Sequence, residues 1–214
     1  MSLLALLCQD LPFCLGCFFV LPEFRAVFLK GGVGVGDLGL FLVVSYVAGH
    51  LVAAVGNVLE SVWWRFRGGW PSQWILRKDQ KILAPAQVTK LEARIRGRLG
   101  LPSVMLAGME PGQWQSVFRQ ITTEVAREGR DARAEIFNGN YGMNRGIASA
   151  FLMVALFNVS ASWTDWQTTI LSALLALLAL TRMDRFGGHY ARTMIMEFLQ
   201  LPETDKDRAK VGLS

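Results

Sequence analysis

The chain has 214 residues, of which 52% are hydrophobic and only 18% are charged, and its formal net charge is +5. Positive mean hydropathy with so little charge is too apolar for an ordinary soluble domain of this length. We therefore expect an all-α integral membrane protein with about four transmembrane or re-entrant helices and a small helical cytoplasmic domain. A basic protein of this kind faces anionic lipid headgroups or nucleic acid, and charge alone does not choose between them.

Residues 1–64 form the first expected domain, an N-terminal membrane hairpin. Its first apolar segment, residues 3–30, is interrupted by prolines and acidic residues, so it either spans once as a kinked helix or re-enters. Its second segment, residues 38–64, is long enough to cross a hydrocarbon core, which takes roughly 20 apolar residues. Gly49 and Gly56 lie on this second helix, where a neighbouring backbone could approach closely.

A polar stripe runs along the second segment. Its members fall at i, i+4, i+11 and i+14 on one helix face: Tyr46, His50, Asn57 and Glu60. Ionisable residues at membrane depth are costly and usually face a protein interior or a water-filled cavity. The stripe therefore indicates a proton or ion path, or the lining or gate of an oligomeric pore. The alternative is structural, with interhelical hydrogen bonds that fix packing and an ion pair from Glu60 to Arg65 or Arg67.

Residues 65–145 form a basic helical domain, with fourteen of the 22 Lys and Arg residues of the chain. Two apolar stripes at helical spacing predict two amphipathic helices: Val88, Leu91, Ile95 and Leu99 in the first, and Trp114, Phe118, Ile121 and Val125 in the second. The first helix ends before Gly100, and the second begins near Glu110 and Pro111.

Residues 146–182 form the C-terminal membrane hairpin, with segments 146–162 and 168–181, and residues 183–214 form a juxtamembrane helix and tail. Lys and Arg are concentrated in residues 65–145 and after residue 181, and the turn of the hairpin has none. This bias predicts that the basic domain and the C-terminus are cytoplasmic.

Two polar clusters border the hairpin. Arg182, Arg185, His189 and Arg192 share one helix face at i, i+3, i+7 and i+10, and guanidinium groups in this arrangement are suited to binding phosphate. The ligand could be a lipid headgroup, an RNA backbone or a nucleotide, and the simpler interpretation is headgroup anchoring.

The segment EIFNGNYGMNRG, residues 135–146, holds the other cluster: Glu135, Asn138, Asn140, Tyr141, Asn144 and Arg145. Asn and Gly favour a tight connection before the next helix. The preferred hypothesis is one shared polar site from both clusters, which serves binding or gating.

Signatures of an enzyme are otherwise absent, and we expect no cofactor and no metal, because the two histidines, His50 and His189, lie in different regions.

Arg182 and His189 fit the R-x6-H spacing of the HEPN ribonucleases, in which these residues act on RNA phosphate. In layout the chain resembles small multi-pass membrane accessory and effector proteins of bacterial anti-phage, CRISPR-associated systems. The resemblance implies that the protein forms a homo-oligomer and compromises the membrane during infection. We also expect a location in the bacterial inner membrane and, as a candidate cytoplasmic partner, a nucleotide or an RNA–protein complex. The alternatives are a membrane-tethered RNA-acting protein and a passive anchor subunit.

Overall fold

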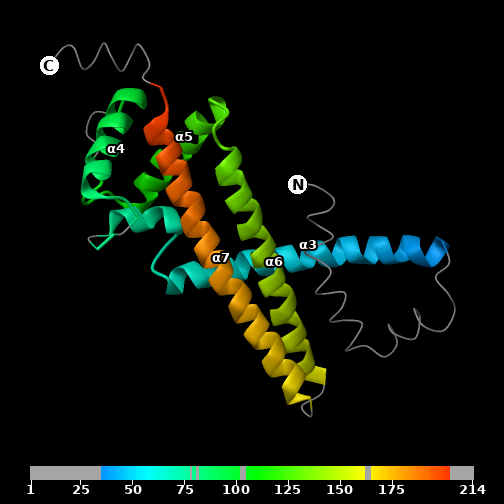
Figure 1. Cartoon of the computed structure of the whole chain (residues 1–214). Coiled ribbons are helices and arrows are strands. Elements are labelled where there is room, and N and C mark those ends of the chain that lie inside the picture. The colour runs from blue at the N-terminus through cyan, green and yellow to red at the C-terminus, as the bar shows by residue number, and fades with distance from the viewer. Residues whose placement is uncertain (1–34, 78, 81, 102–104, 162–164, 203–214) are drawn as a thin grey trace. The chain divides into compact units, whose positions relative to one another are not determined.

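The computed structural model describes residues 35–77, 79–80, 82–101, 105–161 and 165–202, in which helices are joined by turns and loops and no strand occurs. The elements in chain order are α3 (Val35–Phe66), the 3-10 helix η1 (Pro71–Leu76), α4 (Pro85–Arg98), α5 (Pro111–Arg127), α6 (Ala132–Ala161) and α7 (Trp166–Gln200) (Figure 1). The all-α class is thus confirmed for this part of the chain. The segment 3–30 and the end of the tail lie outside the described residues.

The chain divides into two compact units. Unit 1 comprises Met1–Phe66 and Gly139–Asp184, and unit 2 comprises Arg67–Asn138 and Arg185–Ser214. The long helices α6 and α7 each contribute residues to both units.

Unit 2 is a helical domain built on the two apolar stripes. Both α4 and α5 begin with a proline at the first helical position, where the missing N–H costs nothing. The α5 stripe is fully inside the core, with Trp114, Phe118, Ile121 and Val125 all buried. It packs with Leu91 and Ile95 of α4 and with Met194, Ile195 and Phe198 of α7. The two predicted amphipathic helices are therefore confirmed, and their apolar faces meet the end of α7.

Charged side chains hold the helix ends of unit 2 in place. Arg98, at the end of α4, donates to Glu124 at 3.3 Å, to Glu128 at 2.8 Å and to the Pro202 carbonyl at 2.8 Å. Its side chain is only 3% exposed, so all three acceptors compensate one buried guanidinium. The arginine thus links α4 to α5 and to the residues that follow α7.

In unit 1, α3 packs on α6 through a ridge of buried residues spaced four positions apart. The buried members of the ridge are Ala48, Val52, Gly56, Glu60 and Trp64. A methyl group placed on Gly56 would lie 3.0 Å from the Ser149 hydroxyl oxygen, so the two helices approach closely at this point. The atoms nearest to this methyl group belong to the side chains of Ser149 and Arg145, so the close backbone approach expected at Gly49 and Gly56 stays a prediction.

The α6–α7 hairpin of unit 1 is joined by a buried amide near its turn. Asn158 Nδ2 donates to the Asp165 carbonyl at 2.7 Å and to the Thr169 hydroxyl at 2.8 Å. Asn158 is 3% exposed, and both bonds satisfy a polar group inside an apolar segment. This contact fixes how α6 leads into α7.

By length and composition, one helix in the described part of the chain could cross a membrane, Ala132–Ser160, and 44% of its apolar window is buried. A buried core helix of a soluble protein meets the same test, so the helix is weak support for membrane association. The expectation of about four membrane or re-entrant helices is not confirmed.

The expected tight connection at residues 135–146 is wrong, because the whole segment is helical within α6. Its Asn144 side chain donates to the Asn140 carbonyl at 2.7 Å, one turn back along the same helix. Ala134 and Ala148, on either side of the segment, are fully buried. Tertiary packing of these positions outweighs the turn preference of Asn and Gly.

Candidate functional site

A buried carboxylate on α3 is the centre of a polar cluster in the described part of unit 1. Glu60 is 6% exposed, and its Oε2 accepts a hydrogen bond from Arg145 Nη1 of α6 at 2.5 Å. Its other oxygen, Oε1, accepts from the Tyr141 hydroxyl. The residue thus pairs with Arg145, and the expected ion pair with Arg65 or Arg67 is replaced by one that joins two helices.

Trp64 completes the cluster from the next turn of α3. Its indole Nε1 donates to the Tyr141 hydroxyl at 3.0 Å, and the two rings stack with centroids 6.2 Å apart at 11°. The Tyr141 hydroxyl therefore accepts one hydrogen bond and donates another. We call these four residues, Glu60, Trp64, Tyr141 and Arg145, the α3–α6 network.

The chemistry available to the α3–α6 network is charge neutralisation and helix pairing. Both oxygens of Glu60 already accept hydrogen bonds, and its negative charge lies beside one guanidinium. A carboxylate held in this way is not available as an open general base. The network instead keeps a charged pair inside unit 1 without an unsatisfied group.

The remaining members of the α3 stripe lie on the exposed side of the helix. Tyr46, His50 and Asn57 are all exposed, and the Tyr46 and His50 rings touch edge to face with centroids 4.6 Å apart. Successive residues of this ridge are four positions apart, so each lies about 40° further around the axis of α3 than the one before it. The ridge reaches the helix face that carries the polar stripe only near the C-terminal end of α3. Glu60 is therefore buried against α6, whereas Tyr46 and His50 are exposed.

The residues of the predicted shared polar site fall into both units. Tyr141, Asn144, Arg145 and Arg182 belong to unit 1, whereas Asn138, Arg185, His189 and Arg192 belong to unit 2. Asn144 is buried at 3% exposure, and Asn138 is exposed and donates to Glu135 at 3.2 Å. The contacts of Tyr141 and Arg145 join this cluster to Glu60, a partner that the sequence hypothesis had not given them.

In unit 2, His189 lies against an aromatic residue of α6. Its ring stacks on Phe137 with centroids 5.4 Å apart at 28°, and Phe137 also lies 6.5 Å from Phe186. Arg185, His189 and Arg192 are exposed on α7. A catalytic role for Arg182 and His189 stays a prediction.

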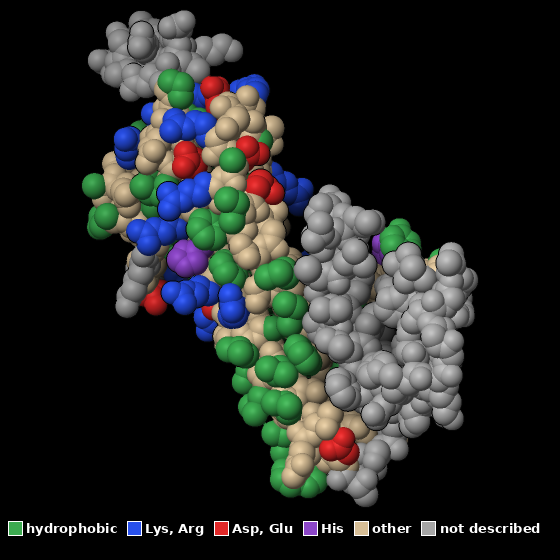
Figure 2. All heavy atoms as spheres, turned by 45° about the vertical axis from the view of Figure 1, so that its right-hand side comes forward, with side chains coloured by type: hydrophobic (Ala, Val, Ile, Leu, Met, Phe, Trp, Pro, Cys, Tyr) green, Lys and Arg blue, Asp and Glu red, His purple; other side chains and the backbone are tan. Residues whose placement is uncertain are grey.

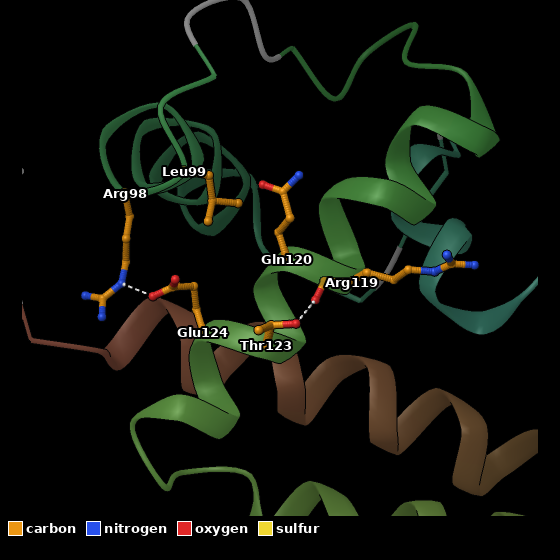
Figure 3. A pocket seen from close by; sticks show the side chains of 6 residues that line it. All are labelled: Arg98, Leu99, Arg119, Gln120, Thr123 and Glu124. Atoms are coloured by element: carbon orange, nitrogen blue, oxygen red, sulfur yellow. Dashed lines mark hydrogen bonds and ion pairs between the residues drawn. The ribbon is translucent and has the colours of Figure 1, made fainter.

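A surface cleft of about 340 Å³ lies between α4 and α5 of unit 2, lined by Arg98, Leu99, Arg119, Gln120, Thr123 and Glu124 (Figure 3). Figure 3 shows Arg119 pointing away from the cleft and Arg98 turned toward Glu124. Of the two arginines that line the cleft, Arg98 already donates to three acceptors and is therefore committed within unit 2.

Two contributors were missed from the sequence, Trp64 in the network and Asn158 in the hairpin. Trp64 resembles an interfacial tryptophan in sequence, and nothing local marks its hydrogen bond to Tyr141. Asn158 carried a usable signal, because a lone amide within an apolar helix usually pairs with a neighbouring helix. Across the described ranges, no group of three or more His, Cys, Asp and Glu residues is placed to hold a metal ion.

No protein-family model, no curated protein and no solved structure matches the chain.

Proposed function

We propose that the chain is an integral membrane protein that assembles as a homo-oligomer, in which the exposed polar residues of α3 line or gate a path through the assembly. The observation that carries this proposal is the exposed surface of α3. Tyr46, His50 and Asn57 are exposed on a helix whose other exposed residues include Val43, Val47, Leu51 and Val58. Polar groups facing lipid would be costly, and a second copy of α3 would give them partners.

A second feature supports membrane insertion of unit 1. Seven large apolar side chains of the α6–α7 hairpin are between 46% and 61% exposed: Leu156, Phe157, Ile170, Leu171, Leu174, Leu177 and Leu178. Figure 2 shows hydrophobic side chains gathered along this hairpin. A soluble monomer rarely exposes so continuous an apolar surface, whereas a bilayer would cover it.

The α3–α6 network fits this proposal as a neutral internal anchor. Its carboxylate and guanidinium compensate each other within unit 1, so a bilayer would meet no uncompensated charge there. The network holds α3 on α6, and within the described residues another side of α3 carries the exposed Tyr46, His50 and Asn57, against which another copy could pack.

The cellular setting belongs to the same proposal. In a bacterial inner membrane, the Lys and Arg bias supports an orientation with unit 2 and the C-terminus in the cytoplasm, where unit 2 would receive the activating signal. The layout resemblance supports a role as an effector in anti-phage defence.

Dye release from liposomes that contain the full chain tests whether the assembly forms a path through the membrane. Wild-type protein should release dye, and His50→Leu should reduce release because it removes a polar group from the exposed side of α3. Val47→Leu, a change at a neighbouring exposed position, should leave release unchanged.

Oligomer size in detergent is measured on the same samples. A monomeric wild-type chain, or wild-type liposomes that stay sealed at every protein density, would refute the proposal.

A further inference from the structure

Four cationic or imidazole side chains gather on one face of unit 2. Arg185, His189 and Arg192 lie at i, i+4 and i+7 on α7, so they share a helix face, and all three are exposed. The stacking of His189 on Phe137 places this face beside α6. Arg133 lies one turn before Phe137, and because α6 and α7 run antiparallel, it lies toward Arg192.

The arginines of this face differ from the arginines that hold unit 2 together. Arg98 and Arg130 bind carboxylates of α5 and α7. Within the described residues, Arg133, Arg185 and Arg192 make no hydrogen bond or ion pair. Their guanidinium groups are therefore available to an anion from outside the chain.

The face also has an apolar component. Ile136, at i+3 from Arg133, is 64% exposed, and Phe137 beside it is half-buried. Exposed aliphatic surface next to arginine suits the border of a bilayer, where a ligand offers both a phosphate and apolar chains. A nucleic-acid backbone offers no comparable partner for Ile136.

The direction of the side chains on α7 also favours a lipid headgroup as the ligand. Cα–Cβ bonds tilt toward the N-terminus of a helix, and the N-terminal half of α7 is its apolar segment. The side chains of Arg185, His189 and Arg192 therefore lean back toward that segment. Arg192 lies seven residues after Arg185, about 10 Å along the helix, and a long arginine side chain spans much of this distance.

We propose that this face, formed by Arg133, Ile136, Phe137, Arg185, His189 and Arg192, binds the headgroups of anionic phospholipids. The inference rests on the proposed function, because it takes the apolar half of α7 to be inserted in the bilayer. It adds a specific partner to that function: the phosphodiester of an anionic lipid, held by Arg185 and Arg192, with Ile136 and Phe137 against its apolar part. The exposed face would then couple the lipid composition of the membrane to the position of unit 2.

Thermal unfolding of the full chain in mixed micelles tests the inference, because a ligand that binds only the folded state raises Tm. Phosphatidylglycerol at about a hundred times its Kd should raise the Tm of the wild type by roughly 5 °C more than phosphatidylcholine does. The double variant Arg185→Gln, Arg192→Gln should lose most of this difference. The control Lys90→Gln, Arg96→Gln removes the same charge from exposed positions of α4 and should keep it.

Several results would overturn the inference. An equal loss in both double variants would show general charge attraction, and an equal shift with inorganic phosphate would show a free-phosphate site. A larger shift with a single-stranded oligonucleotide would assign the face to nucleic acid. Folding of each double variant is checked by its Tm in phosphatidylcholine micelles, which should match the wild type.

This outcome is separable from that of the proposed function. Lipid binding by micelle-embedded chains needs no self-association, whereas dye release does. If phosphatidylglycerol raises the Tm of the wild type no more than phosphatidylcholine does while dye release is intact, only the inference of lipid binding is refuted.

Discussion

The Glu60–Arg145 pair allows a quantitative test of the α3–α6 network. The Glu60 side chain is 8% exposed and the Arg145 side chain is 26% exposed, with 2.5 Å between their charged atoms. Arg145→Ala leaves a buried carboxylate with no cation, which should lower the free energy of unfolding by about 3–5 kcal/mol. Glu60→Ala should cost less, about 1–3 kcal/mol, because the remaining guanidinium is partly exposed and can turn toward water.

The double variant separates the pair from its surroundings. Glu60→Ala, Arg145→Ala removes both charges together, so its loss should be smaller than the sum of the single losses by about 2–3 kcal/mol. The measurement is the free energy of unfolding in detergent, followed by tryptophan fluorescence. Glu135→Ala, at an exposed carboxylate of α6, is the matched control and should change stability by no more than about 0.5 kcal/mol. Additive losses, or a larger loss for Glu60→Ala than for Arg145→Ala, would refute this account of the network.

Three further predictions concern other contacts. Arg98→Ala removes the buried guanidinium that joins Glu124, Glu128 and the Pro202 carbonyl, and it should lower the Tm of the full chain by several degrees; a Tm within a degree of wild type would show that these contacts are dispensable. Asn158→Leu removes both hydrogen bonds across the hairpin and should cost about 1–2 kcal/mol of unfolding free energy in detergent; an unchanged value would contradict a stabilising role for the Asn158 amide. Burial, with Glu135 and Asp131 nearby, raises the pKa of Tyr190, so its phenol stays protonated in the folded state where the unfolded chain ionises. Stability should therefore be unaffected by this group below about pH 10 and fall above it, and Tyr190→Phe should remove that loss in thermal melts taken across the alkaline range.

Local patterns account for what could be predicted about unit 2. The spacing of Leu91 and Ile95, and of Trp114 and Phe118, depends only on the 3.6-residue period of a helix, so their burial follows from the sequence. Pro85 and Pro111 fix where the two helices begin, because proline is tolerated there and not further in. None of this requires knowledge of a neighbouring helix.

The candidate site depended on a neighbour that the sequence does not identify. On α3 alone, Glu60 lies in the same arc as His50 and Asn57, and the sequence gives no reason to separate them. The contact with α6 follows the ridge through Gly56, which rotates around α3 and buries Glu60 against Arg145 and Tyr141.

Sequence alone thus determined that the chain is helical, apolar and basic, and which faces of α4 and α5 are buried, because these properties are set by composition and by a period of a few residues. Tertiary structure alone decided that Glu60 pairs with Arg145, and that the Asn- and Gly-rich segment around Tyr141 is helical. Both outcomes depend on residues more than eighty positions apart or on packing that outweighs local preference.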